Sequence, residues 1–275
     1  MDDDLDLYEI IAKGFIDHCK DKLGWEDLSN DVIMDVGCGE DGFCCKTILE
    51  IFPDVGTIIC IDSNPRVASN FKLRTTTKIE CVIADIEKRE SIRDYEAEIT
   101  KVISTNAFHQ LMEKEEAFRN VYRLLKPGGE AAVLFAIESS LYEWLTELLK
   151  NPTWEEAYQC HYVEDMYQTG FGTAQYKEMV EKIGFQVIES SEKQRVSSFS
   201  SDQDCKELLY DMCGEKFKLP PELLEEFKEE CYQVLLKLNP RDAKGKPCYR
   251  ATELSLLLVK PKEGADSETK ENLAI

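Results

Sequence analysis

Four segments of this chain place carboxylate, hydroxyl or glycine residues directly after short apolar runs. Glycine tolerates positive φ angles and leaves room for a ligand to approach the backbone. Carboxylates and hydroxyls accept the hydrogen bonds that ribose, adenine and amine groups donate. The combination predicts a site for a nucleotide-like cofactor that lies on the glycine turn. The residues are Asp35, Gly37, Cys38 and Gly39 in the first segment, Asp62 and Ser63 in the second, Asp85 and Ile86 in the third, and Ser104 in the fourth.

Each acidic residue has its own expected role. Asp35 precedes the glycine turn, where its side chain can reach polar groups of the ligand. Asp62 can accept both hydrogen bonds from a ribose diol, and Asp85 can meet an adenine amino group while Ile86 packs on the ring. A single aspartate after a strand is as readily a turn or helix cap. The prediction therefore rests on the three acids together with the glycines.

The residues after the glycine turn separate two cofactor classes. A dinucleotide places its pyrophosphate over the N-terminus of the following helix, where negative protein charge is unfavourable. Glu40 and Asp41 occupy that position here. Carboxylates suit a cationic methionine amine better than a pyrophosphate, so the sequence favours S-adenosylmethionine, with a dinucleotide as the alternative.

Strand-like and helical patterns alternate along most of the chain, which predicts an α/β fold with a Rossmann-like sheet covered on both faces. The carboxyl ends of parallel strands share one edge, so such a sheet brings the four segments together. The expected strands are 32–36, 57–61, 79–84, 101–104, 130–137, 185–189 and 252–259. The expected helices are 4–23, 42–52, 65–74, 113–125 and 174–183.

Two segments interrupt this alternation. One is aromatic-rich (about residues 139–172), and the other (about 197–250) contains an amphipathic helix that opens at Pro220-Pro221. We expect both to be caps over the carboxyl edge of the sheet, where ligands bind in such folds. The alternative is that they extend the core. Residues 1–262 then form a single domain, followed by a polar, disordered tail over 263–275.

Composition limits the classes of function. The formal net charge of −21 over 275 residues argues against binding to nucleic acid or to an anionic membrane. No apolar run approaches the roughly 18 residues of a membrane span, and the acidic N-terminus does not resemble a signal peptide. The 11 cysteines form no C-x-x-C pair, and the 3 histidines have no metal-ligand spacing. We therefore expect reduced thiols in the cytoplasm and no metal site.

These motifs resemble those of class I S-adenosylmethionine-dependent methyltransferases. The segment 35–42 is similar to their motif I, Asp62 to the acid after the second strand, and 84–86 to their adenine motif. The segment 124–130, Leu-Leu-Lys-Pro-Gly-Gly-Glu, is similar to the entry into their fifth strand. The resemblance implies a seven-stranded methyltransferase sheet with an antiparallel last hairpin, and S-adenosylmethionine as the cofactor.

Further segments resemble the juvenile hormone acid methyltransferases over nearly the whole chain. They are Leu7-Tyr8, Trp25, 117–125, Trp154, 183–185 and 217–220 with the acidic helix that follows. This family esterifies the carboxylate of a sesquiterpenoid or fatty-acid-like substrate. A carboxylic acid with a pKa of roughly 4–5 is ionised at neutral pH. Methyl transfer to it needs proximity, desolvation and orientation, and no general base.

The substrate-orienting positions differ from the family pattern. Gln110 stands where the family has a Trp that helps hold the substrate carboxylate, and Tyr8 stands where an N-terminal Gln contacts it. Both can donate a hydrogen bond, and His109 is a further candidate. An apolar substrate also implies a capped hydrophobic pocket. Its candidate residues are Phe108, Leu111, Leu141, Tyr142 and Trp144.

The expected function is therefore carboxyl O-methylation of a small apolar acid by a monomeric or homodimeric enzyme. Two alternatives stay open because Gln110 and Tyr8 depart from the family. The first is an amine, phenol or thiol acceptor, which would need a base or a lowered pKa. The second is a cofactor-binding protein without catalysis. A dehydrogenase is a more distant alternative, which competition between NAD and S-adenosylmethionine would reveal.

Overall fold

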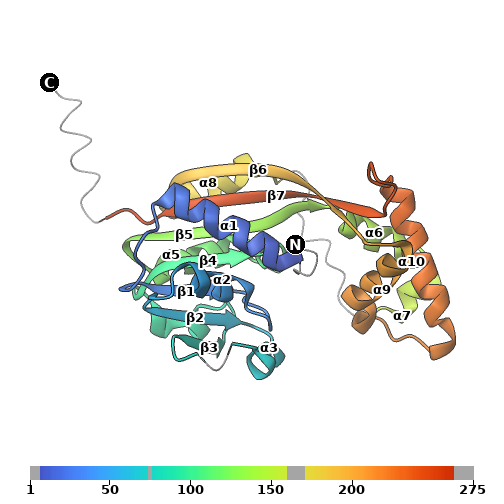
Figure 1. Cartoon of the computed structure of the whole chain (residues 1–275), viewed down its shortest axis with the longest axis horizontal. Coiled ribbons are helices and arrows are strands. Elements are labelled where there is room, and N and C mark those ends of the chain that lie inside the picture. Colours follow the sequence, from blue (N-terminus) through green and yellow to red (C-terminus); the bar gives the residue numbers. More distant parts are fainter. Residues whose placement is uncertain (1–6, 74–75, 160–170, 263–275) are drawn as a thin grey trace. The chain divides into compact units, whose positions relative to one another are not determined.

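The apolar run Val32–Val36 forms the interior strand β1 of a seven-stranded sheet, between β2 and β4 (Figure 1). The computed structural model describes residues 7–73, 76–159 and 171–262. Ile33 and Met34 point to opposite faces of β1 and have no exposed surface, as expected for a strand between two helical layers. The strand order is β3-β2-β1-β4-β5-β7-β6. The remaining strands are β2 Thr57–Asp62, β3 Ile79–Ile83, β4 Ile99–Thr105, β5 Leu125–Ser139, β6 Gln186–Ser198 and β7 Cys248–Val259.

Parallel pairing aligns the carboxyl ends of the strands that carry the four segments. β1 pairs in parallel with β2 and with β4, and β2 pairs in parallel with β3. In this register Asp35 lies opposite Cys60, and Asp62 lies opposite Ile83. The turns after β1, β2, β3 and β4 therefore meet at one edge of the sheet, as the sequence predicts.

The other side of the sheet is mixed in direction. β5 runs parallel to β4, with a register shift between Leu125 and Glu130 around the Lys-Pro-Gly-Gly turn. Gly128 N–H donates to the carbonyl of Lys260 (2.7 Å), and Lys260 N–H donates to that of Gly129 (2.8 Å). The start of β5 therefore lies beside the end of β7, so these two strands run antiparallel. This confirms the seven-stranded methyltransferase sheet expected from the resemblance.

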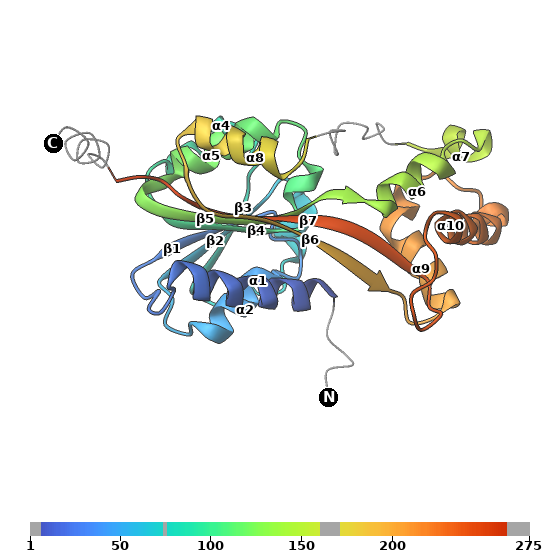
Figure 2. The same cartoon turned by 90° about the horizontal axis from the view of Figure 1, so that it is seen from above.

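Helices cover both faces of the sheet in the first of two compact units, which comprises Met1–Phe135, Thr169–Glu192 and Leu254–Ile275. Figure 2 shows α1 and α2 on one face, and α4, α5 and α8 on the other. Phe15 of α1 and Ile48 of α2 belong to the buried core of the first face. The helices are α1 Leu7–Leu23, α2 Phe43–Ile51, α3 Pro65–Asn70, α4 Arg89–Ile92, α5 Lys114–Leu124 and α8 Thr173–Ile183, with short 3-10 turns η1 Arg93–Tyr95 and η2 Phe108–Gln110.

The second unit comprises Ala136–Gln168 and Lys193–Glu253 and has a core of its own. The ring of Trp154 meets the ring of Phe227 edge-on, with centroids 5.1 Å apart, and Phe217 lies 4.7 Å from Phe227. Its helices are α6 Ser140–Leu148, α7 Pro152–Ala157, α9 Asp202–Cys213 and α10 Leu224–Leu238, with η4 Gly214–Lys216 and η5 Pro221–Leu223. The reading of these segments as caps on a single domain stays a prediction.

The expected elements occur in the expected order and differ mainly at their ends. The largest difference is β6, which continues to Ser198 instead of ending at Glu189. Residues 190–198 are mostly polar, which is tolerated because β6 is an edge strand with a neighbour on one side only. The expected tail over 263–275 and residues 160–170 of the aromatic-rich segment lie outside the described residues.

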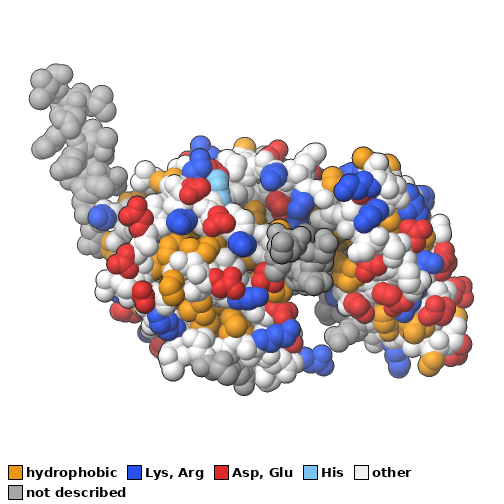
Figure 3. Space-filling model, in the orientation of Figure 1, with side chains coloured by type: hydrophobic (Ala, Val, Ile, Leu, Met, Phe, Trp, Pro, Cys, Tyr) orange, Lys and Arg blue, Asp and Glu red, His pale blue; other side chains and the backbone are white. Residues whose placement is uncertain are grey.

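Charge is spread over the surface in both signs. Figure 3 shows acidic side chains interspersed with lysines and arginines over the visible face, without one continuous acidic patch. On this face the acidic side chains are therefore solvated surface groups. Within the described ranges, we found no helix with the length and apolarity needed to cross a membrane.

Candidate functional site

The glycine turn follows β1 directly, and β2 fixes its backbone. Gly37 and Cys38 donate their N–H groups to the carbonyl of Ile61, at 2.8 and 3.3 Å. Gly37 and Gly39 have φ angles of 73° and 64°, which favour glycine. A Cβ at Gly37 would lie 2.3 Å from the Cβ of Ala107, so only glycine lets the turns after β1 and β4 pack this closely. None of the described residues lies within 4 Å of a Cβ built at Gly39, which leaves room for a ligand.

Asp62 links the first two turns. Its Oδ2 accepts the N–H of Gly39 (3.3 Å), and its Oδ1 accepts the N–H of Asn64 (2.9 Å). Asp62 is half-buried and Ser63 is exposed. The carboxylate is thus held in one orientation beside the glycine turn, and each oxygen keeps a lone pair that could accept a hydrogen bond from a hydroxyl.

Asp35 points into the core instead of toward the solvent. It is 1% exposed, and its Oδ2 accepts a hydrogen bond from the Sγ of Cys45 at 3.0 Å. Burial raises the pKa of Asp35 to about 7; the charge of Asp62 adds to this rise, and the bond from Cys45 opposes it. Any interaction of this carboxylate with ligand polar groups stays a prediction.

Buried thiols surround Asp35. The Sγ of Cys45 lies 3.0 Å from that of Cys60, and the Sγ of Cys44 lies 3.1 Å from the Oγ1 of Thr105. Burial raises the pKa of the Cys44 and Cys45 thiols well above the usual value. These cysteines are therefore protonated packing residues at neutral pH.

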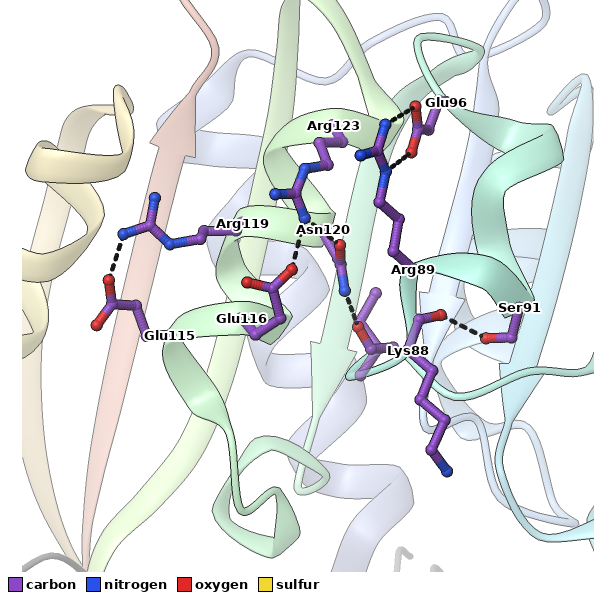
Figure 4. Close-up of polar contacts among 10 residues, drawn as sticks. Lys88, Arg89, Ser91, Glu96, Glu115, Glu116, Arg119, Asn120 and Arg123 are labelled. Atoms are coloured by element: carbon purple, nitrogen blue, oxygen red, sulfur yellow. Dashed lines mark hydrogen bonds and ion pairs between the residues drawn. The ribbon is translucent and has the colours of Figure 1, made fainter.

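Asp85 follows β3 by two residues and lies in a turn held by side chains. Its Oδ1 accepts the N–H of Glu87 (3.0 Å), and its Oδ2 lies 2.8 Å from the Nζ of Lys88. The hydroxyl of Ser91 accepts the N–H of Asp85 (3.0 Å) and lies 2.8 Å from the carbonyl of Lys88, a contact drawn in Figure 4. Ile86 beside it is buried. An acceptor and an apolar side chain thus stand together in this turn, and their assignment to adenine stays a prediction.

Asn120 of α5 supports the same turn and was not predicted from the sequence. It is completely buried, and its Nδ2 donates to the carbonyl of Ile86 at 2.8 Å. An asparagine inside a helix gives no sequence signal for such a contact, because the partner is a backbone carbonyl 34 positions away.

The turn after β4 carries the predicted orienting residues. Ser104 is buried and its hydroxyl donates to the carbonyl of Val36 (2.7 Å), so it joins the ends of β4 and β1. Asn106 has a φ angle of 57°, and η2 follows it. His109 is half-buried and Gln110 is exposed. The side chain of Gln110 can therefore meet a ligand without rearrangement.

The predicted substrate-pocket residues of the first unit occupy different environments. Phe108 is fully buried, and its ring lies 4.8 Å from Phe118 and 6.0 Å from Phe135, which is the environment of a core residue. Leu111 is half-buried. Tyr8, in the first turn of α1, is 44% exposed.

The other pocket candidates belong to α6 of the second unit. Trp144 is buried in the core of that unit, and its Nε1 donates to the carbonyl of Cys231 at 2.7 Å. Leu141 packs against the same core, and both Leu141 and Tyr142 are half-buried. The assignment of these three residues to a substrate pocket stays a prediction.

Metal ligation has no structural support in the part of the chain that the structure describes. No group of three or more histidine, cysteine or acidic side chains is placed to hold a metal ion there. The same ranges contain only free cysteines.

Comparison with known proteins agrees with this geometry. Residues 34–133 match the family model described as a methyltransferase domain. Juvenile hormone acid O-methyltransferase of Drosophila melanogaster is 19% identical over 235 residues, covering 83% of this chain and 78% of the relative. The enzyme of the same name from Bombyx mori is 23% identical over 226 residues, covering 80% of this chain and 79% of the relative.

Solved structures share the fold. The BH2331 protein of Bacillus halodurans, described as a candidate methyltransferase, superposes with a TM-score of 0.59 at 14% identity, covering 91% of this chain and 99% of that one. Phosphoethanolamine N-methyltransferase 2 of Haemonchus contortus, in complex with phosphomonomethylethanolamine and S-adenosylhomocysteine, gives a TM-score of 0.50 at 15% identity. That match covers 90% of this chain and 52% of the other protein.

Proposed function

The chain is a class I S-adenosylmethionine-dependent methyltransferase, and from this premise we propose that its acceptor is the carboxylate of a small apolar acid. The relatives that it matches along most of their length are named for O-methylation of an acid, juvenile hormone acid. The proposal extends that acceptor class, sesquiterpenoid or fatty-acid-like acids, to this chain.

We assign the cofactor to the turns after β1, β2 and β3. The glycine turn with Gly37 and Gly39 lies under its central part, Asp62 accepts from the ribose hydroxyls, and Asp85 with Ile86 receives the base. The fit is supported by the open space at Gly39 and by the fixed, partly unsatisfied carboxylate of Asp62. Asp62 and Asp85, acceptors on neighbouring turns, match a ligand whose ribose and base present donors.

The packing of Gly37 on Ala107 is the observation that supports the proposed acceptor site most directly. It holds the turn after β4 against the cofactor turn, since a Cβ at Gly37 would come 2.3 Å from that of Ala107. His109 and Gln110 follow within three residues, and Gln110 is exposed. An exposed amide next to the cofactor turn is suited to donate a hydrogen bond to a substrate carboxylate.

The proposed reaction requires no general acid or base from the protein. S-adenosylmethionine supplies an electrophilic methyl group. A carboxylic acid with a pKa of about 4 to 5 is already ionised at neutral pH, so no residue needs to remove a proton. The task left to Gln110, with Tyr8 and His109 as further candidates, is to hold the carboxylate in line for displacement. Apolar neighbours such as half-buried Leu111 would exclude water from that carboxylate.

A transfer assay tests this function. Labelled methyl transfer from S-adenosylmethionine would be measured to farnesoic acid and medium-chain fatty acids, with amines and phenols of matched length as controls. We expect ester formation with the acids only. Gln110→Ala should raise KM for the acid several-fold, and Gln110→Trp should raise activity on farnesoic acid, because it restores the residue of the resembled family.

The outcomes separate the alternatives. Binding of S-adenosylmethionine without transfer to any acid would overturn the acceptor assignment. Transfer to an amine or phenol would identify another acceptor class. Unchanged kinetics in both Gln110 variants would remove this residue from the carboxylate site.

A further inference from the structure

Asn120 is a completely buried polar side chain with two fixed contacts. Its Nδ2 donates to the carbonyl of Ile86 at 2.8 Å, and its Oδ1 accepts from the Nη1 of Arg123 at 2.6 Å. The same Nη1 lies 2.6 Å from the Oε1 of Glu116. Figure 4 shows Asn120 between Arg123 and the turn that leads to Lys88.

Arg123 determines which way the amide faces. A guanidinium has donors and no acceptor, so the atom of Asn120 beside it must be the oxygen. The NH₂ group is then left to face the Ile86 carbonyl. Glu116 holds Arg123 in turn, so the chain of contacts runs from the surface of α5 to the turn after β3.

We propose that Asn120 is a positioning residue that fixes the base-reading turn at Asp85 and Ile86, and that it thereby sets the selectivity of the cofactor site for adenine over hypoxanthine. The proposal rests on the assignment of Asp85 and Ile86 to the base made above. It concerns Asn120 and Arg123, which we assign neither to the base nor to the acceptor.

The selectivity follows from hydrogen-bond polarity. The 6-amino group of adenine donates, whereas the 6-oxygen of hypoxanthine accepts. The Asp85 carboxylate can only accept when ionised, so it favours adenine as long as it stays opposite the 6-position. Asp85 precedes Ile86 in the chain, so a shift of the Ile86 carbonyl carries the carboxylate with it.

Asn120 is the contact of this turn that water cannot replace. Ser91, which also holds the turn, is exposed, and water can take over its hydrogen bonds. Asn120 and Ile86 are both buried, so loss of the amide donor leaves the Ile86 carbonyl unsatisfied, and the turn must move to satisfy it.

The experiment measures cofactor affinity and base selectivity in the full-length protein. Isothermal titration calorimetry would give Kd for S-adenosylhomocysteine and for S-inosylhomocysteine, in which the 6-amino group is replaced by oxygen. Asn120→Asp keeps the side-chain volume and the contact with Arg123 but cannot donate to Ile86 when ionised. Arg119→Ala is the matched control, because Arg119 lies on the same helix in a surface pair with Glu115 (Figure 4).

We expect Asn120→Asp to raise Kd for S-adenosylhomocysteine about tenfold and to lower the adenine-to-hypoxanthine preference by a similar factor. Arg123→Ala, which frees the amide to rotate, should lower the preference about threefold. It keeps Asn120 itself and so tests the same role if Asn120→Asp does not fold. Arg119→Ala should leave both affinities unchanged.

Three results would overturn the proposal, each at a different step. If the Asn120 and Arg123 variants lower the Tm but keep the wild-type preference, both residues are structural only. If the wild type binds both ligands equally, Asp85 does not read the base. If the wild type binds neither and transfers no methyl group to any acid, the cofactor assignment itself fails; binding of S-adenosylhomocysteine without transfer would remove only the acceptor assignment.

Discussion

The turns after β1 and β3 lie at the same edge of the sheet but are held in shape by different means. The β1 turn is shaped by its glycines and by backbone contacts: Gly37 takes a positive φ and leaves space for Ala107, and its N–H donates to the carbonyl of Ile61 in β2. The β3 turn depends on side chains from elsewhere, Ser91 after it and Asn120 on α5. The residue types of the motif therefore determine much of the shape of the first turn, whereas the shape of the second depends on side chains outside it.

The carboxylates of the two turns differ in burial and in their neighbours. Asp35 is buried among thiols, and burial raises its pKa to about 7. Asp85 is half-buried beside Lys88, whose ammonium is exposed and lies 2.8 Å away. An acid inside the fold affects stability, whereas an acid at the edge with an exposed counter-ion is suited to exchange partners with a ligand.

The largest expected effect is at the backbone of the β1 turn. Gly37→Ala adds a Cβ at 2.3 Å from that of Ala107 and at a φ of 73°, so we expect a loss of about 2–5 kcal/mol in unfolding free energy and loss of cofactor binding. Gly39→Ala is the control: its φ is 64° but the space around it is open, so it should cost only about 1–2 kcal/mol. Urea unfolding measures both, and equal losses would contradict the role of the Ala107 contact.

A smaller effect, and a pH-dependent one, is expected at Asp35. Its folded pKa of about 7 is above the ordinary value of 3.8, so between these values the folded protein binds the proton more tightly than the unfolded chain. Stability contributed by this proton is present at low pH and is lost as the pH rises toward 7. The unfolding free energy of Asp35→Asn should therefore fall less steeply with rising pH than that of the wild type. The difference should be about 2–3 kcal/mol between pH 5 and pH 8. Parallel unfolding profiles of the two proteins would show that Asp35 is ionised in the core.

The smallest effect is expected at Ser91 in the β3 turn. Ser91→Ala removes the hydroxyl that accepts the Asp85 N–H, but the site is exposed and water can replace it. We expect Kd for S-adenosylhomocysteine to rise no more than about threefold, or about 0.6 kcal/mol. A loss as large as that predicted for Asn120→Asp would mean that burial does not distinguish the two supports.

Much of the fold could be predicted from the sequence, because its strands are short apolar runs bounded by glycine, proline and aspartate. The expected strand over 32–36 has the bounds of β1. The outer half of β6 could not be found, since an edge strand in water needs no apolar alternation. Helix α9, Asp202–Cys213, was not expected either, although its buried residues Cys205, Leu209 and Cys213 stand at helical spacing.

The site could be predicted only where residue type itself fixes geometry. The places of Gly37 in a turn and of Asp62 after a strand could be predicted, because a turn and a strand-end acid have recognisable positions; their roles toward the cofactor stay predictions. Asn120 was missed because its contact is with a backbone carbonyl, which leaves no trace in composition or spacing. Phe108 was expected in a pocket, but aromatic residues in a pocket wall and in a core follow the same pattern, and here its ring packs between Phe118 and Phe135.

The thiols around Asp35 can also be used to measure local opening of the fold around them. Cys45 and Cys60 have no exposed surface, and only an exposed thiolate reacts with an alkylating reagent. Cys45 lies on α2 and Cys60 on β2, so they can be modified only while α2 and β2 are transiently exposed. The alkylation rate under native conditions therefore measures how often this part of the enzyme opens. The measurement needs no engineered cysteine, and a ligand that closes the edge of the sheet would lower the alkylation rate.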